Sequence, residues 1–312
     1  MTIGIIGYGQ LSKALLSQKY VFDNLLYIVI RDENKRNIAI QKYPNITIYS
    51  NIDEIEQFAD LNLILTKDSN ISEVVSSLIN NQFLVSNNNP KAIFAHCSGA
   101  TSIDVLNPLF EIGYSIIKAH PYQTFGFYDE TNTDSLFQNV AWLCEVKSNN
   151  ISKTQNIISE FTSNLNGKTI WKESITNFDE RYYHASSIFA SNYLNSLIQI
   201  VKEFSKFSGI DADTFIYPIM RQTLENNFNI DGEADFTKSN FPISGPIARG
   251  DIETVRKQIE NIKLIKETNT LSNLDFLKYY KEFGELTAHF CYTNGIFGIE
   301  KFEEFKKLFQ ES

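Results

Sequence analysis

The chain opens with an apolar strand, a glycine turn and a helix. Ile3-Gly4-Ile5-Ile6 is β-rich, Gly7-Tyr8-Gly9-Gln10-Leu11-Ser12 follows at once, and a helical pattern runs from Gln10 to Lys19. In such a turn the first glycine permits the tight bend, and the second lets the backbone approach a pyrophosphate beside the positive end of the helix dipole. Ser12 replaces the usual third glycine and is still small enough for close helix–strand packing. The turn therefore predicts a dinucleotide site, the alternative being an incidental turn in a non-binding βα unit. The residues expected to touch the dinucleotide here are Gly7, Tyr8, Gly9, Gln10 and Leu11.

Strand-like and helical patterns continue to alternate up to about residue 170. Predicted strands cover residues 25–30, 46–49, 61–65, 92–95, 115–118 and 141–146, and residues 71–78 have helical spacing. This alternation predicts parallel βαβ units in a doubly wound, mostly parallel Rossmann sheet. From Asn177 onward long helical patterns replace the strands, at residues 182–207, 211–227, 251–266 and 272–293, with a polar loop over 231–250. We therefore predict an α/β Rossmann domain over residues 1–170 and an all-α substrate and dimerisation domain over 171–312.

Composition excludes several classes of partner. A length of 312 residues favours two domains, and a net charge of −9 provides no electrostatic footprint for nucleic acid or anionic lipid. The three cysteines are far apart and form no CxxC pair, so neither a disulfide framework nor a metal site is expected. A strand that begins at Thr2 leaves no room for a signal peptide, and no apolar stretch approaches the length of a membrane helix. We expect a cytoplasmic protein that acts on a small molecule and forms a homodimer through its helical domain.

The end of the second predicted strand decides the choice of cofactor. An acidic residue there would hold the ribose hydroxyls of NAD, whereas an arginine would pair with the extra phosphate of NADP. The sequence offers both, because Arg31 comes first, Asp32 follows, and Lys35 and Arg36 lie one turn further on. The cluster of cations on an otherwise acidic protein favours NADP(H) over NAD(H), with Arg31 and Arg36 as the phosphate ligands. A solvated charged loop is the alternative.

Five separated segments resemble one family. They are residues 60–71, His96-Cys97-Ser98-Gly99-Ala100, His120-Pro121-Tyr122-Gln123-Thr124-Phe125, the stretch from Tyr183 to Tyr193, and residues 244–255 with Ser244-Gly245-Pro246. The family they resemble joins a Rossmann-like NAD(P)-binding domain to a C-terminal helical domain long described as of unknown function. Its architecture is related to pyrroline-5-carboxylate and ketopantoate reductases, and its members include an alternative class of ketopantoate reductase. The chain departs from the family pattern at Ser12 and at Ser244, where threonine is frequent. The resemblance implies NAD(P) binding and only weakly implies a substrate.

Three loops follow predicted strands at the edge where open α/β sheets bind ligands. The first contains Thr66 and Lys67, the second Ser98 and Gly99, and the third His120. We expect Thr66, Lys67, Ser98 and Gly99 to contact the cofactor, with Ser98 also within reach of a substrate carboxylate. A plain turn is the alternative for Ser98 and Gly99. His120 either borders the nicotinamide or pins its own turn.

Polar residues interrupt the helical pattern that begins near Tyr182. Ser191 and Asn192 follow His184 by seven and eight residues. This spacing places the three side chains on one stripe of a regular α-helix. Ketone reduction needs a proton donor beside the carbonyl oxygen and further donors to fix the substrate. His184 is the first candidate for the acid and His120 the second, with Ser191 and Asn192 as hydrogen-bond anchors. The alternative is an interface histidine with small polar residues that permit close packing.

Arg249 lies in a Gly/Pro loop before a predicted helix, where a guanidinium is able to bind a substrate carboxylate in bidentate fashion. It is equally able to bind Asp251 or Glu253 as part of the loop. Lys67 and Lys118 are further candidates for the acid, and the sequence singles out neither. The predicted substrate ligands are Ser98, Asn192 and Arg249.

These features together predict an NADPH-dependent reductase of a small 2-oxo acid. The leading substrate is 2-dehydropantoate, whose reduction to pantoate belongs to pantothenate biosynthesis. A reductase of pyrroline-5-carboxylate-type imines is the alternative enzyme. A non-catalytic dinucleotide sensor or scaffold is the alternative from another class, because fold alone does not determine function.

Overall fold

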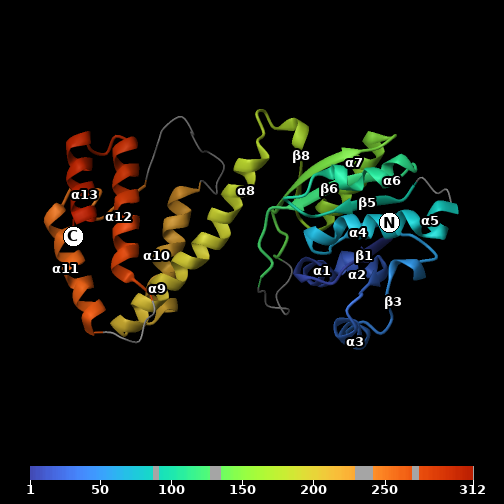
Figure 1. Cartoon of the computed structure of the whole chain (residues 1–312), viewed down its shortest axis with the longest axis horizontal. Coiled ribbons are helices and arrows are strands. Elements are labelled where there is room, and N and C mark those ends of the chain that lie inside the picture. The colour runs from blue at the N-terminus through green and yellow to red at the C-terminus, as the bar shows by residue number, and fades with distance from the viewer. Residues whose placement is uncertain (87–90, 127–134, 229–241, 269–273, 312) are drawn as a thin grey trace. The chain divides into compact units, whose positions relative to one another are not determined.

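The computed structural model describes residues 1–86, 91–126, 135–228, 242–268 and 274–311. The chain divides into two compact units, Met1–Ser191 and Asn192–Ser312. The first unit holds the whole sheet together with the first helices, and the second unit is helical (Figure 1).

An eight-stranded sheet forms the centre of the first unit, in the order β3-β2-β1-β4-β5-β6-β7-β8. The strands are β1 (Ile3–Ile6), β2 (Leu25–Val29), β3 (Thr47–Tyr49), β4 (Leu61–Ile64), β5 (Ile93–His96), β6 (Ser115–Pro121), β7 (Ala141–Lys147) and β8 (Lys168–Trp171). Strands β1 to β6 pair in parallel, whereas β7 runs antiparallel to β6 and β8 runs parallel to β7. The prediction of a doubly wound, mostly parallel Rossmann sheet is confirmed.

Two hydrophobic cores cover the two faces of this sheet. Alternate strand residues serve each core, so that Ile5 belongs to one and Ile6 to the other. One face packs on α1 (Gln10–Leu16), α3 (Glu33–Lys42) and α7 (Ile151–Asn164), and the other on α4 (Ile71–Asn80), α5 (Gln82–Ser86) and α6 (Asn107–Glu111). Burial on both faces explains why the central strands are continuous apolar runs, since a parallel strand between two helical layers exposes neither side.

The second unit consists of α9 (Leu194–Ser208), α10 (Ala212–Asn227), α11 (Ile252–Thr268), α12 (Phe276–Thr293) and α13 (Ile299–Glu311). The last three helices pack around a core that includes Val255, Ala288 and Phe305 (Figure 1). Gly284 allows α12 and α13 to approach closely, because a Cβ there would lie 2.4 Å from the Phe309 ring. The prediction of a helical C-terminal region is confirmed.

Several elements differ from the sequence-based expectation. The helix predicted over 10–19 ends at Leu16, and a short helix α2 (Lys19–Asp23) follows. The long helix predicted over 182–207 is divided into α8 (Glu180–Ile188), a π-helical segment (Phe189–Tyr193) and α9. The helix predicted from Ser272 begins at Phe276, where the Asp275 side chain caps it, and Ser272 itself lies outside the described residues. Most of the loop predicted over 231–250 also lies outside them, and α13 was not predicted.

No helix in the described part of the chain is long and apolar enough to cross a membrane. The described residues also contain no cluster of three or more His, Cys, Asp or Glu side chains suited to a metal ion. All three cysteines are buried and free.

Candidate functional site

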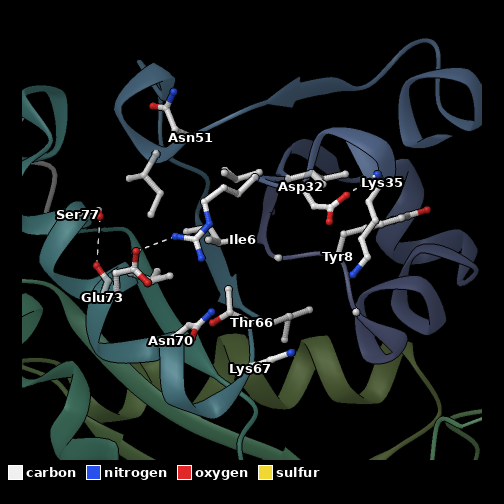
Figure 2. A pocket seen from close by; sticks show the side chains of 18 of the residues that line it. Ile6, Tyr8, Asp32, Lys35, Asn51, Thr66, Lys67, Asn70, Glu73 and Ser77 are labelled. Carbon is white, nitrogen blue, oxygen red and sulfur yellow. Dashed lines mark hydrogen bonds and ion pairs between the residues drawn. The ribbon is translucent and has the colours of Figure 1, made fainter. Parts of the chain in front are cut away.

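A pocket of about 490 Å³ lies at the carboxyl ends of β1, β2 and β4 in the first unit (Figure 2). This is the edge at which open α/β sheets bind ligands, and the pocket has the size of a small-molecule site. Of the predicted cofactor ligands, Gly7, Tyr8, Gly9, Arg31, Thr66 and Lys67 line it. Residues that the sequence did not single out also line it, among them Ser50, Asn51, Asn70 and Glu73.

The two glycines of the turn are constrained in different ways. Gly7 has φ of +112°, and a Cβ there would lie 2.7 Å from the Leu65 carbonyl oxygen. Gly9 has an ordinary φ of −100°, and the nearest described atom to a Cβ there would be the Leu65 oxygen at 3.9 Å. The protein itself therefore leaves the side of Gly9 open, as a backbone that a pyrophosphate approaches closely requires.

Ser12 closes the same turn from within the helix. Its buried hydroxyl donates to the Gly7 carbonyl oxygen at 3.0 Å and accepts a longer bond of 3.4 Å from the Gly9 N–H. The serine at the position of the third glycine thus stabilises the turn and leaves the open side of Gly9 unchanged.

One polar atom in this pocket has no partner within the described structure. The Thr66 hydroxyl oxygen is buried, and none of the described residues hydrogen-bonds to it. A buried hydroxyl without a partner is uncommon and costs free energy unless a ligand or water satisfies it. The open glycine, the free hydroxyl and the cations at the rim together fit a phosphate-bearing dinucleotide.

Charged side chains surround the end of β2. The Arg31 guanidinium donates to the Glu73 carboxylate at 2.7 Å, and both residues line the pocket (Figure 2). Asp32 accepts from the Lys35 backbone N–H at 2.9 Å and so caps α3. Part of the Asp32 carboxylate is therefore occupied with the helix and is less available to ribose hydroxyls.

Arg36 has a different position from the one expected. Its guanidinium donates to the backbone oxygens of Ile30 and Arg31 at 3.1 and 3.3 Å, and it does not line the pocket. Arg36 therefore holds the carboxyl end of β2 in place. Lys35, one residue earlier on the same helix, lines the pocket instead.

A second group of polar side chains gathers at the ends of β5 and β6. His96 pairs in register with Lys118, and His120 lies two residues beyond Lys118, so the three side chains lie on one face of the sheet. Helix α8 supplies Tyr183 and His184 to the same group, since both rings pack against His120. The topology thus brings both predicted catalytic histidines, His120 and His184, together within the first unit.

Gly99 permits the two histidines to converge. A Cβ on this buried residue would lie 2.7 Å from Cε1 of His184 and 2.9 Å from Nε2 of His120. The other nitrogen of His120, Nδ1, shares a hydrogen bond of 2.6 Å with the Tyr183 hydroxyl. Tyr183 therefore fixes the ring so that Nε2 is the nitrogen on the Gly99 side.

Burial disfavours charge throughout this group. Desolvation, with the charges of His184 and Lys118, lowers the pKa of His120 to about 4. Desolvation and the charge of Lys118 likewise lower the pKa of His96 to about 4, and these effects outweigh the hydrogen bond with the Ser102 backbone, which acts in the opposite direction. Burial raises the pKa of Tyr183, so that its hydroxyl stays protonated. His96 and His120 are therefore neutral at pH 7 in the free protein.

Lys118 is the buried cation behind the histidines. Its side chain is 5% exposed and forms an ion pair with Glu180, the first residue of α8. Burial raises the pKa of Glu180, but the hydrogen bond and charge of Lys118 outweigh this effect and leave that pKa below its ordinary value. The pair fixes the start of α8 against β6.

The remaining predicted residues have local roles. The Ser98 hydroxyl bonds within its own turn, donating to the Thr101 hydroxyl at 2.9 Å and accepting from the Thr101 N–H at 3.0 Å. Gln10 donates from its side chain to the Gly126 oxygen at 3.3 Å, and Leu11 packs on the hydrophobic core.

The predicted stripe on the long helix rests on unbroken α-helical spacing, which the π-helical segment interrupts. Ser191 donates to the Ser187 oxygen at 2.7 Å, within its own helix, and Asn192 belongs to the second unit. In that unit Arg249 is exposed and its backbone closes a turn, while the Asp251 carboxylate binds Thr254 and so caps α11.

Besides the uncharged pocket residues named above, sequence reasoning missed Glu73, His96, Tyr183 and Glu180. His96 and Tyr183 each lie at the start of a segment quoted for the family resemblance, so their position was a signal. Glu73 and Glu180 are ordinary helix-surface acids in sequence, and only the folded structure shows the cations that they meet.

Comparison with known proteins supports this fold. Residues 1–121 match the Rossmann-like domain family, and residues 146–287 match the domain of unknown function DUF2520. No curated protein matches the chain in sequence.

Solved structures resemble the chain over most of its length. A Bacteroides fragilis protein described as an NADP oxidoreductase is 17% identical over 92% of this chain and 98% of its own, with a TM-score of 0.64. The pyrroline-5-carboxylate reductase of Coxiella burnetii is 14% identical over 98% of both chains, with a TM-score of 0.56. The pyrroline carboxylate reductase of Plasmodium falciparum, solved with NADP bound, is 15% identical over 99% of this chain and 98% of its own, with a TM-score of 0.54. At these identities the likeness shows the fold alone. The two domain matches confirm the predicted pairing of a Rossmann-like domain with a C-terminal domain of unknown function.

Proposed function

We propose that the protein is an oxidoreductase that uses NADP(H). The observation that carries the proposal is the open side of Gly9, within a pocket that also presents the unpartnered Thr66 hydroxyl and the cations Arg31, Lys35 and Lys67. A side chain at Gly9 would meet no described atom closer than 3.9 Å, so the glycine is explained by a ligand rather than by packing. The structures solved from B. fragilis and P. falciparum, one described as an NADP oxidoreductase and one with NADP bound, share this fold.

The chain's residues divide into a binding part and a chemical part. Gly7, Gly9 and Thr66 would hold the pyrophosphate, and Arg31 with Lys35 would bind the 2′-phosphate of the adenosine ribose. A reduced nicotinamide supplies a hydride when it is bound. The group at the ends of β5 and β6 follows the pyrophosphate site along the sheet, in the order β1-β4-β5-β6, and would hold the substrate.

His120 is the proton donor that the geometry favours, ahead of His184. Tyr183 holds Nδ1 of His120, which leaves Nε2 to give a proton to the carbonyl oxygen as the hydride reaches the carbonyl carbon. The C=O double bond becomes a C–O single bond, and the imidazole regains its proton from solvent. A substrate carboxylate beside the ring would raise the low pKa of His120 toward the working pH, because an opposite charge favours the protonated form.

The substrate proposed first is a small 2-oxo acid, with 2-dehydropantoate as the leading compound, because such a molecule offers both a carboxylate and a ketone to this group. A cyclic imino acid of the pyrroline-5-carboxylate type is the second candidate. It is favoured by the two pyrroline carboxylate reductases with the same fold. Both substrates carry a carboxylate near the bond that is reduced: it is attached to the carbonyl carbon of a 2-oxo acid, and to the ring carbon on the other side of the nitrogen in the imine.

A cofactor-oxidation assay tests the proposal. The purified protein is incubated with NADPH and, separately, with 2-dehydropantoate, other 2-oxo acids and pyrroline-5-carboxylate, and loss of NADPH absorbance is followed. Turnover with one class of substrate identifies it, and His120→Ala should then lower kcat by roughly 10²–10⁴-fold, as expected for loss of a general acid. Tyr183→Phe should change the pH profile of kcat without removing activity. NADPH that neither binds nor is consumed would refute the proposal, and an unimpaired His120→Ala enzyme would transfer the acid role to His184.

A further inference from the structure

The ion pair between Arg31 and Glu73 spans the rim of the dinucleotide pocket. Arg31 follows β2, whereas Glu73 lies in the first turn of α4, and the atoms Nη1 and Oε1 are 2.7 Å apart. Both side chains are well exposed, at 71% and 59%, and both line the pocket. An exposed ion pair stabilises a fold by only about 0–1 kcal/mol, so a purely structural reason for this contact is weak.

The position of Arg31 indicates a role for this ion pair in the choice of cofactor. Arg31 is the second residue beyond β2, in the region where Rossmann proteins distinguish a free ribose 2′-hydroxyl from a 2′-phosphate. A 2′-phosphate needs the guanidinium that Glu73 now holds, and it also meets the negative charge of Glu73 itself. A dinucleotide without the 2′-phosphate needs neither the guanidinium nor relief from that charge.

We infer that Glu73 is a specificity-determining residue that opposes the 2′-phosphorylated cofactor by competing for Arg31. The inference rests on the proposed function, because it concerns the same pocket. Glu73 thereby sets the ratio of NADPH to NADH affinity, and its carboxylate on α4 balances the charge of Arg31, which follows β2. Asp32 does not fill this role, since its carboxylate caps α3.

Isothermal titration calorimetry with NADPH and NADH tests the inference without any need for turnover. Glu73→Gln keeps the size of the side chain and removes its charge. We expect it to bind NADPH roughly three- to tenfold more tightly, the range set by a surface ion pair and a nearby like charge, while NADH affinity changes less than twofold. Adenosine 2′,5′-bisphosphate and ADP, used as shorter probes, should show the same contrast. Glu56→Gln is the matched control, because it removes an exposed carboxylate that does not line the pocket.

A double-mutant cycle tests whether Glu73 changes NADPH affinity through Arg31. If Glu73 acts through Arg31, Glu73→Gln should give most of its gain only when Arg31 is present, and little in the Arg31→Ala background. An equal gain for NADPH and NADH, no gain for NADPH, or weaker NADPH binding would overturn the inference. These results differ from failure of the proposed function, in which the unmodified protein would bind neither dinucleotide.

Discussion

Gly7 and Gly9 lie two residues apart in one turn, yet replacing them should have opposite consequences. Gly7 has a left-handed φ of +112° and is in close contact with the Leu65 backbone, so a side chain there strains the fold. Gly9 has an allowed φ for any residue and an open side. Gly7 is therefore required by the fold of the protein, whereas Gly9 is required for the approach of a ligand.

Gly7→Ala should therefore destabilise the first unit. A Cβ would lie 2.7–2.9 Å from backbone atoms of Leu65 and Thr66, which are unable to move as a flexible side chain would. We expect a loss of about 1–3 kcal/mol in the free energy of unfolding. Urea unfolding followed by tryptophan fluorescence measures it, because both tryptophans, Trp142 and Trp171, belong to the first unit. An unchanged midpoint would contradict the strain at this position.

Gly9→Val should leave the fold intact and abolish dinucleotide binding. The side chain enters space that the described protein leaves free, and that space is the approach of the pyrophosphate. We expect NADPH affinity to fall by more than about 100-fold, with the unfolding midpoint close to that of the unmodified protein. Calorimetry gives the affinity and the same fluorescence assay serves as the control for folding. Retained micromolar affinity would place the cofactor elsewhere.

At the scale of single residues, the sequence predicted the ligands that belong to a local pattern. The glycine turn, Thr66 and the two histidines were found because strand ends and turns are visible in the sequence. Arg36 was expected to bind phosphate, but its guanidinium holds the end of β2, and Lys35 lines the pocket instead. Which of two neighbouring cations on a helix faces a pocket depends on the rotation of the helix about its axis. The sequence alone did not predict this rotation for α3.

Helix α8 is the element on which the arrangement of the histidines depends. It carries Tyr183 and His184, and its first residue, Glu180, is bound to the buried Lys118 of β6. A buried ammonium that loses its partner keeps its desolvation cost. The ion pair therefore orients the helix as well as stabilising it.

Glu180→Gln should lower stability at pH 7 by about 1–2 kcal/mol, a figure reduced because Glu180 itself is 38% exposed. The pKa of Glu180 is lowered in the folded protein, so its contribution is complete above its ordinary value of 4.5 and is lost as the pH falls through the lower folded value. The difference between Glu180→Gln and the unmodified protein should thus disappear in acid. Unfolding by urea at a series of pH values measures it, and a difference that persists at low pH would contradict the assignment.

The unmodified protein should also lose stability between pH 6.5 and 4, independently of Glu180. The pKa values of His96 and His120 are about 4 in the folded chain against 6.5 for a free histidine, so the unfolded state takes up protons first as the pH falls. Glu180→Gln should retain this decline, which separates the histidine contribution from the carboxylate contribution.

Strand positions were predicted well at the scale of elements, because buried parallel strands are short apolar runs between helical patterns. The reversed direction of β7 was not predicted, since it depends on which strand lies beside it and not on its own residues. The π-helical segment was also missed, and with it the break in the expected stripe from His184 to Asn192, because the pattern was interpreted with the 3.6-residue period of an α-helix throughout. Helix α13 carried a readable signal, since Phe302, Phe305 and Phe309 recur at helical spacing.

At the scale of the whole molecule, the second unit presents apolar side chains that its own core does not use. Helix α10 has no buried residue, and Phe215, Tyr217 and Ile219 are 60%, 61% and 64% exposed. Leu224 and Phe228, toward the end of the helix, are 47% and 67% exposed, and their spacings of seven and eleven residues place them on the same helical face as Tyr217. An isolated helix of this length is only marginally stable in water, and an exposed apolar face such as that of Tyr217, Leu224 and Phe228 marks an interaction site.

We propose that a second copy of the chain covers α10 and that the protein is a homodimer in solution. Sedimentation equilibrium should then give the mass of two chains. Tyr217→Glu combined with Leu224→Glu should give the mass of one, because each buried carboxylate would have to lose its hydration without a partner. Gln222→Glu, which adds the same charge at a polar position of the same helix, should remain dimeric and serves as the control. An unmodified protein that sediments as a single chain would contradict the proposal. Circular dichroism distinguishes loss of the dimer from loss of the helix. A dissociated variant that keeps its helical signal has lost only the interface.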